Sequence, residues 1–175
     1  MEKGIIIWQS KYGATEKYEN RLKEETGFDR VRTAGAKADA VKEYDTIILC
    51  GGIYASGIAG LSFLRKNYRA LRDKKIAVFC AGTSPFDEKT FEEVRAHNLK
   101  EDLKEIPVFY GRGAWDEKGM TFKDRTLCRM LQKAVAKKDP DDYEPWMSAL
   151  MCAAGQKCDW TDKEYLKPLL EFVRG

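Results

Sequence analysis

Ser10, Gly13 and Thr15 stand between a short apolar segment and a stretch with helical periodicity. A helix N-terminus leaves backbone N–H groups without partners and carries partial positive charge, so a loop that enters one suits a phosphate group. Ser10 and Thr15 would add hydroxyl donors, and Gly13 would let the backbone close around the anion. The loop predicted to bind phosphate consists of Ser10, Lys11, Tyr12, Gly13, Ala14 and Thr15. The alternative that Thr15 only caps the helix stays open.

Other phosphate chemistries do not match the sequence. A Walker A loop and the G-x-G-x-x-G dinucleotide fingerprint are both missing after the first apolar segment. A receiver domain needs acidic residues at strand ends that here read WQS and LCG. A Cys-x5-Arg phosphatase loop fails because Ser56 and Phe86 stand at the arginine position after Cys50 and Cys80. We therefore predict a phosphate site without catalytic residues.

Two more loops of small residues follow apolar segments. "CGGIYASGIAG", residues 50–60, carries four glycines, and "CAGTSP" covers residues 80–85. Tyr54 would cover one face of a flat ring, or it would simply pack on a neighbouring helix. The residues predicted to line the ring are Gly52, Ile53, Tyr54, Ala55, Ser56 and Gly57, with Ala81, Gly82, Thr83 and Ser84 as the remaining wall. A phosphate cradle beside a planar ring site predicts FMN.

The elements that must position these loops alternate along the chain. Strands are expected at 5–8, 46–50, 75–80 and 106–111, with an edge strand at 28–34, and helices at 15–26, 61–72 and 88–97. Continuous apolar runs suit strands that are covered on both faces. The alternation predicts an α/β fold with a parallel sheet, helices on both faces and ligand loops at the carboxyl edge.

The pattern changes after the fifth strand, so residues 110–160 form an elaborated segment of one domain spanning 1–175. Residues 122–137 place an apolar stripe beside a basic face, which would suit an anionic membrane, an acidic partner, or simple packing and solvation. The stripe consists of Phe122, Leu127, Met130, Leu131, Ala134 and Val135, and the basic face of Arg125, Arg129, Lys133 and Lys137. A closing helix is expected within 159–175, where Pro168 makes the assignment less regular.

Three residues after the fifth strand, Tyr110, Arg112 and Trp115, would stand at the ligand edge. There an aromatic could shield a ring and an arginine could meet an acidic substrate, although a solvent-facing connection also explains them. Lys11 reads as a solvated lysine, and His97 as a residue that caps a helix C-terminus.

Composition narrows the function classes. The 175 residues suit a single domain, and a net charge of +3 without dense basic runs argues against nucleic acid. Five cysteines without a CxxC pair, and one histidine, argue against a metal site or a disulfide framework. The short polar start and the lack of a long apolar run lead us to expect a cytoplasmic protein.

The chain resembles flavodoxin-domain proteins over nearly its whole length. Ser10, Gly13 and Thr15 after "IIIWQ" are similar to the flavodoxin phosphate loop. "YDTIILCGGIYASG", "FYGRGAW" and "CDWTDKEYLKPLLEFV" look like segments of the menaquinone-dependent protoporphyrinogen oxidases. The resemblance implies a flavodoxin-like three-layer sandwich, five parallel strands in order 2-1-3-4-5, and noncovalent FMN.

The chain departs from both kinds of relative. Its net charge is +3 and its loop at 51–60 contains no Asp or Glu, whereas electron-carrier flavodoxins are typically acidic around the flavin. The segment "WDEKGMTFKDRTLCRML" is shorter and less hydrophobic than the resemblance to the oxidases implies. We expect an FMN-dependent oxidoreductase with a quinone- or porphyrinogen-type acceptor and possible contact with the membrane surface. The alternative is an electron carrier that docks to redox partner proteins.

Overall fold

A five-stranded parallel sheet forms the centre of the computed structural model, which describes residues 2–175. Its strands are β1 (Gly4–Gln9), β2 (Asp29–Arg32), β3 (Thr46–Tyr54), β5 (Lys75–Gly82) and β6 (Val108–Arg112), in the order β2-β1-β3-β5-β6. Register pairs Gln9 with Gly51, Gly52 with Ala81, and Gly82 with Arg112. The carboxyl ends of the four adjacent strands therefore meet at one edge, and the predicted strand order is confirmed.

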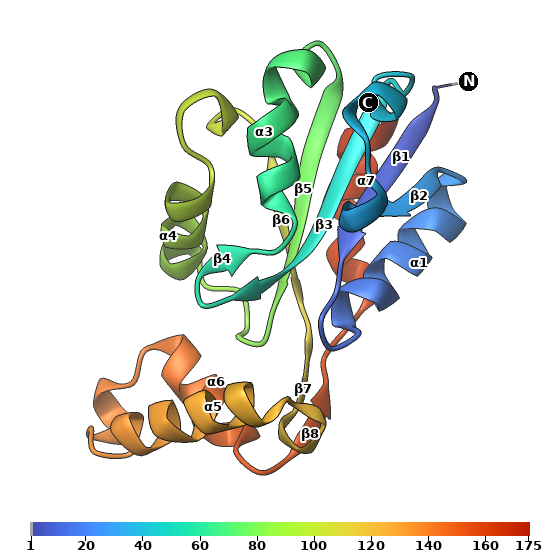
Figure 1. Cartoon of the computed structure of the whole chain (residues 1–175). Coiled ribbons are helices and arrows are strands. Elements are labelled where there is room, and N and C mark those ends of the chain that lie inside the picture. The colour runs from blue at the N-terminus through green and yellow to red at the C-terminus, as the bar shows by residue number, and fades with distance from the viewer. Residues whose placement is uncertain (1) are drawn as a thin grey trace.

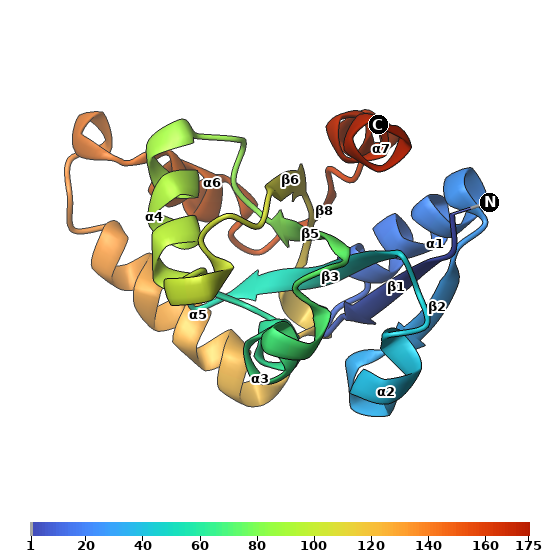
Figure 2. The same ribbon diagram turned by 90° about the horizontal axis from the view of Figure 1, so that it is seen from above.

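Helices cover both faces of this sheet (Figures 1 and 2). One face carries α1 (Ala14–Thr26) and α7 (Lys167–Arg174), and the other carries α2 (Ala38–Val41), α3 (Leu61–Leu71) and α4 (Glu88–Asn98). Successive residues of β1 pack on opposite faces of the sheet. Ile6 packs with Tyr18 of α1, and Ile7 packs with Leu64 of α3. This arrangement explains why the strands are apolar throughout instead of alternating. Pro168 lies in the first turn of α7, where it removes no helical hydrogen bond.

A short strand, β4 (Gly57–Ile58), was not expected from the sequence. It folds back antiparallel on β3, with Tyr54 opposite Gly57, so Ala55 and Ser56 form a two-residue turn. These two residues have φ values of 47° and 65°, the left-handed conformation that such hairpin turns require and that usually selects Gly or Asn. The glycine-bearing loop predicted at 50–60 therefore contains a tight hairpin.

The elaborated segment forms a compact unit, residues 114–159, which we call the lid. Two antiparallel strands, β7 (Ala114–Asp116) and β8 (Lys157–Asp159), attach α5 (Phe122–Val135) and α6 (Pro145–Ala153) to the sheet. Figure 1 shows the lid lying across the carboxyl ends of the strands. It has its own apolar core, which includes Trp115, Val135, Met147 and Leu150.

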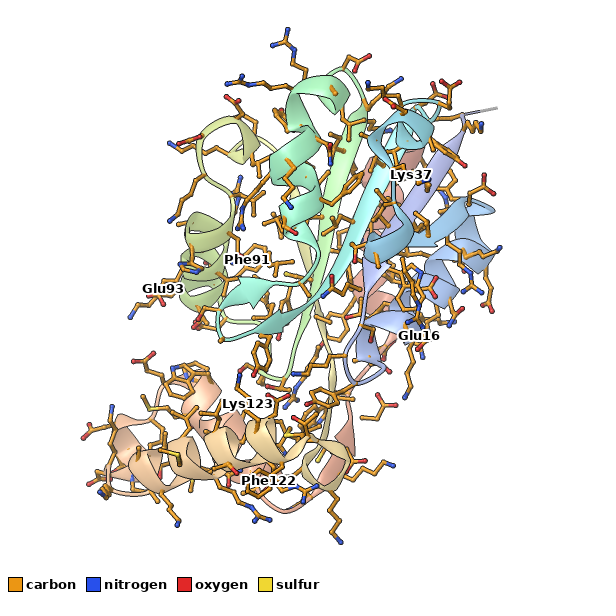
Figure 3. The ribbon with its side chains drawn as sticks, in the orientation of Figure 1. Glu16, Lys37, Phe91, Glu93, Phe122 and Lys123 are labelled. Carbon is orange, nitrogen blue, oxygen red and sulfur yellow. The ribbon has the colours of Figure 1, made fainter. Side chains whose placement is uncertain are left out.

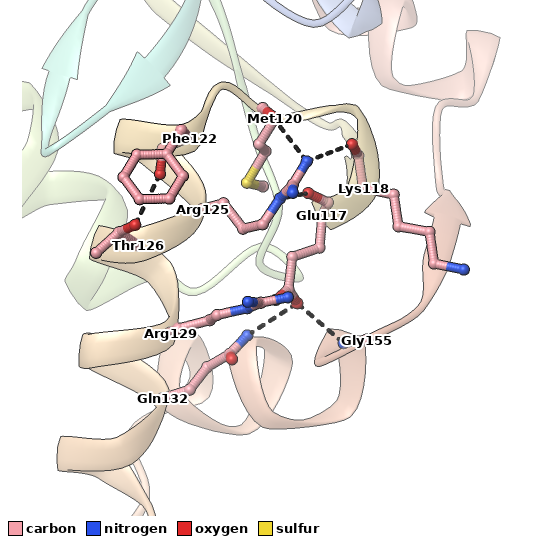
Figure 4. A network of polar contacts seen from close by, with 9 residues as sticks. All are labelled: Glu117, Lys118, Met120, Phe122, Arg125, Thr126, Arg129, Gln132 and Gly155. Carbon is pink, nitrogen blue, oxygen red and sulfur yellow. Dashed lines mark hydrogen bonds and ion pairs between the residues drawn. The ribbon is translucent and has the colours of Figure 1, made fainter.

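Glu117 ties the parts of the lid together (Figure 4). Its carboxylate accepts hydrogen bonds from Arg129 (3.1 Å), Gln132 (3.4 Å) and the backbone N–H of Gly155 (2.9 Å). The Gly155 bond is the main reason why the pKa of Glu117 lies below its usual value, with Arg129 adding to the effect. One carboxylate thus connects the strand ends, α5 and the turn after α6.

Packing was one of the explanations offered for the apolar stripe on α5, and it is wrong for most of the stripe. Val135 is buried, but Phe122 is 84% exposed, Met130 62% and Leu127 49%. The helix instead turns Asp124 and Val135 inward, with the half-buried Cys128 packed on the lid core. The pattern gave the helix correctly but could not give its rotation, because the surface that covers it comes from elsewhere in the chain.

Short 3-10 helices complete the chain, and lie at Thr33–Gly35, Glu101–Leu103, Glu117–Gly119, Pro140–Asp142 and Lys163–Leu166. Within residues 2–175, no helix is both long and apolar enough to cross a membrane.

Candidate functional site

The loop between β1 and α1 opens directly onto a helix N-terminus. Gly13 is the N-cap residue with φ 95°, in the left-handed region that favours glycine, and no side chain caps this helix. The Ser10 hydroxyl oxygen accepts a hydrogen bond from the Gly13 N–H at 3.0 Å, which leaves the hydroxyl proton free to donate. The first-turn N–H groups of α1 therefore face the loop without a side-chain partner.

Thr15 occupies the second position of α1, so the alternative that it is the N-cap is wrong. The side chain is buried, and it makes no hydrogen bond to any other residue within 2–175. The hydroxyl oxygen itself keeps some contact with solvent, so this unpartnered donor is available to a ligand that enters the loop.

The three predicted loops converge on this point. A Cβ atom added to Gly52 would lie 3.5 Å from the Thr15 hydroxyl oxygen. A Cβ atom added to Gly113 would lie 3.4 Å from Ala14 and 3.3 Å from the Gly82 carbonyl oxygen. The loops after β1, β3 and β5 thus approach one another where glycines remove the side chains that would fill the space.

A cavity of about 640 Å³ lies beside this junction, between the loops after β3 and β5, helix α4 and the lid. Ile53, Ala55, Ser56, Gly82, Thr83 and Ser84 line it, so the structure brings most of the predicted ring-binding residues together. Phe86, Phe91, Tyr110 and Trp146 add aromatic walls, and Figure 3 shows Phe91 directed from α4 towards the sheet. The volume falls in the range typical of cofactor and small-molecule sites.

Asn98, at the end of α4, holds the hairpin that carries three of these residues. Its side chain accepts a hydrogen bond from Ile58 N–H at 2.9 Å and donates to the carbonyl oxygens of Ser56 at 2.7 Å and Val94 at 2.8 Å. Asn98 is buried, and its bonds to Ile58 and Ser56 span 40 and 42 residues of sequence, which is why periodicity did not single it out.

Tyr54 lies away from this cavity, beside the loop after β1. Lys11 Nζ is 4.6 Å from the centre of its ring, and its hydroxyl donates to Asp124 Oδ1 at 2.6 Å. Lys11 Nζ pairs with Asp124 Oδ2 at 2.6 Å, and the Tyr12 hydroxyl donates to the same oxygen. Lys11 is therefore paired with a carboxylate of the lid instead of being free in solvent.

Sequence reasoning missed Asp124. Thr121 and Asp124 do form the T-x-x-D pattern of a helix start, and the Thr121 hydroxyl accepts the Asp124 N–H at 3.3 Å. That signal places Asp124 in the first turn of a helix but does not show what the carboxylate contacts. Lys11, followed by the two tyrosine hydroxyls, holds the pKa of Asp124 well below its usual range, while Asp124 raises the pKa values of Lys11 and Tyr54.

The residues after the fifth strand have different positions from those predicted. Tyr110 lines the cavity, and its hydroxyl donates to the Ser84 carbonyl oxygen. The Arg112 side chain donates to the Thr83 carbonyl oxygen at 2.9 Å and lies 4.0 Å from the centre of the Trp160 ring. Trp115 is buried in the lid core, so it cannot shield a ligand. Of these three residues, only Tyr110 lines the cavity.

The cysteines beside the site are not activated nucleophiles. Burial raises the pKa of the Cys80 thiol to about 12 and places that of Cys50 still further above its ordinary value. Both thiols are therefore protonated at neutral pH.

Comparison with known families decides the assignment. The flavodoxin domain model matches residues 5–143, which include β1 through most of the lid. The chain belongs to the flavodoxin domain family. The search of curated proteins found no match.

Solved structures with similarity to this flavodoxin-family chain include the two-electron reduced flavodoxin of Megasphaera elsdenii. It is 19% identical, with a TM-score of 0.45 over 61% of this chain and 84% of that one. A flavodoxin, WrbA-like protein from Agrobacterium tumefaciens is 15% identical, with a TM-score of 0.45 over 75% and 92%. A mutant flavodoxin of Fusobacterium nucleatum bound to flavin mononucleotide is 14% identical, with a TM-score of 0.37 over 70% and 74%.

Proposed function

We propose that this flavodoxin-family protein binds FMN and acts as an oxidoreductase with a quinone-type acceptor. The observation that carries the proposal is the Thr15 hydroxyl, which makes no hydrogen bond within residues 2–175 and lies beside the uncapped N-terminus of α1. A terminal phosphate fits this donor set, because the N–H groups, Ser10 and Thr15 are neutral donors and the helix terminus is partly positive. No second phosphate cradle or dinucleotide fingerprint accompanies the loop in the sequence, which favours a mononucleotide.

The residues have separate tasks in this proposal. The backbone N–H groups of Ala14 and Thr15 and the hydroxyls of Ser10 and Thr15 would hold the phosphate. The hairpin at 52–57 and the turn at 81–84 would line the ring. When bound, FMN supplies one- and two-electron transfer, and the protein supplies binding, orientation and the electrostatic environment.

The cavity lining favours a neutral acceptor. Asp87 and Glu93 line it, whereas the lining residues include no Lys or Arg among those that the structure describes, 2–175. Two hydrogen bonds from Thr90 lower the pKa of Asp87, so this carboxyl is ionised at neutral pH. A porphyrinogen carries carboxylates, which this lining would repel, whereas a quinone is neutral, flat and suited to the aromatic walls.

The outer face of α5 supports contact with an anionic membrane surface. Phe122, Leu127 and Met130 are exposed, and the exposed cations Lys123 and Lys133 lie near the two ends of this apolar row. Arg129 is also exposed but is paired with Glu117. Asp124, the only acidic residue of α5, faces inward. Apolar side chains interleaved with cations are typical of helices that lie in the plane of a membrane surface. Sedimentation with vesicles should show binding that increases with the fraction of anionic lipid and decreases in Phe122→Ala; equal binding to neutral vesicles would contradict this part.

The cofactor is tested on the purified protein. Absorbance spectra and mass spectrometry of the released cofactor should identify FMN, and apoprotein should take up FMN but not FAD. Apoprotein that binds neither flavin, or only FAD, would refute the proposal.

The acceptor is tested by stopped-flow reoxidation of the reduced protein with a water-soluble quinone. Replacing the cavity residue Phe86 with Ala should slow reoxidation about tenfold, which corresponds to about 1.4 kcal/mol of lost aromatic contact. Phe122→Ala removes an aromatic side chain outside the cavity and is the matched control. Equal rates in both variants would favour the alternative, an electron carrier that docks to a partner protein.

A further inference from the structure

Asp124 is the point at which the lid meets two of the three predicted FMN loops. It comes from the first turn of α5 and is 3% exposed. Lys11 and Tyr12 reach it from the loop after β1, and Tyr54 reaches it from the hairpin after β3. A buried carboxylate therefore joins three segments that are far apart in the sequence.

These contacts are the polar interactions that hold the lid helices against the rest of the protein. Between residues 117–156 and residues 2–112, the hydrogen bonds and ion pairs that the structure describes all end on Asp124 or on Thr121 beside it. The Thr121 N–H donates to the Tyr12 hydroxyl at 3.4 Å, which extends the same cluster. At the base of the lid, the chain enters and leaves through the paired strands β7 and β8, where Asp159 of β8 also pairs with Lys17 of α1.

The carboxylate lies beside the phosphate cradle without filling it. Its recorded partners are an ammonium and two phenol hydroxyls, whereas the cradle consists of first-turn N–H groups with Ser10 and Thr15. Asp124 also neutralises Lys11, the one cation of the loop, so the cradle keeps neutral donors. A group with this geometry orders the loops from outside instead of competing with a bound anion.

We infer that Asp124 is a positioning residue that latches the lid onto the loops after β1 and β3, so that closure of the lid and ordering of these two FMN loops are one event. The inference rests on the proposed function for the identity of the ligand, but the latch itself is a property of the protein without FMN. If the Asp124 contacts and FMN binding both require the closed lid, each must favour the other, because either one already provides the free energy of closure.

Hydrogen exchange of the apoprotein tests the latch without a cofactor. Asp124→Asn keeps the shape of the side chain and removes its charge, and Asp124→Ala removes both. Amides of α5 and of the loops at 10–15 and 52–57 should exchange about tenfold faster together in Asp124→Ala, with Asp124→Asn intermediate. Asp141→Asn is the matched control, since it removes one exposed carboxylate from the lid away from the sheet. Loss of protection in α5 alone, or in none of these segments, would overturn the inference.

Binding experiments then test the coupling. FMN should protect the α5 amides in the parent protein and in Asp141→Asn, and its dissociation constant should increase about tenfold in Asp124→Ala. Tyr54→Phe should increase the FMN dissociation constant less in the Asp124→Ala variant than in the parent protein, since Asp124→Ala has already broken the bond that it removes. Unchanged FMN affinity combined with faster loop exchange would contradict the coupling. Failure to bind any flavin would refute the proposed function and leave the apoprotein result standing.

Discussion

Replacing Asn98 with Ala should loosen the hairpin that carries the predicted ring loop. Asn98 is buried, and its amide makes three hydrogen bonds, two of them to the β3–β4 hairpin at Ser56 and Ile58. This hairpin holds two non-glycine residues in the left-handed conformation, which raises its free energy and makes it depend on external support.

The expected magnitude follows from these bonds. Each is worth about 1 kcal/mol net, so their loss should lower the free energy of unfolding by about 3 kcal/mol, and the melting temperature by about 6 to 12 °C. The buried Ile58 N–H also loses its acceptor, and this unpaired group keeps the loss of stability near that value unless water enters to replace the acceptor.

Urea denaturation followed by circular dichroism measures the change. Asn67→Ala is the matched control, because the Asn67 amide donates a single bond of 2.8 Å to the Phe63 carbonyl oxygen within its own helix. It should cost about 1 kcal/mol. An Asn98→Ala variant that loses no more stability than Asn67→Ala would show that the hairpin does not depend on this clamp.

The other predictions concern the same site. Ser56→Gly should raise the free energy of unfolding by about 0.5 to 1 kcal/mol, because Gly adopts φ 65° without steric cost; a decrease on urea denaturation would contradict it. Thr15→Val should weaken FMN binding by about 1 to 3 kcal/mol by removing a buried donor to phosphate, and an unchanged dissociation constant with an intact fold would refute this role. The ionised Asp124 has a lowered pKa, so its stabilising contribution is complete above its ordinary pKa of 3.8 and is lost as the pH falls through the folded-state value. Denaturation at a series of acidic pH values should therefore show a steeper decrease for the parent than for Asp124→Asn, and parallel profiles would exclude this contribution.

The sequence by itself determined the layers of the fold and the kind of loop at each strand end. Apolar runs and helical periodicity are local signals, and they predicted the five parallel strands and the helix starts near residues 14, 61, 88 and 122. The order of the strands came from the resemblance to flavodoxin-domain proteins. The loop at Ser10–Thr15 was also readable, because Ser, Gly and Thr at a strand-to-helix junction carry a local physical meaning. The turn at 55–56 could not be predicted, since Ala and Ser rarely adopt the left-handed conformation that they have here.

Tertiary structure alone decided which side chains meet at the site. Asp124 contacts Tyr12 across 112 positions and Tyr54 across 70, and Asn98 reaches Ser56 across 42. The same packing buries Trp115 in the lid and leaves Phe122 in solvent, opposite to what their local patterns suggested. Periodicity fixes which residues share a face of a helix, but the direction of that face depends on surfaces contributed by distant segments, and these become neighbours only when the chain has folded.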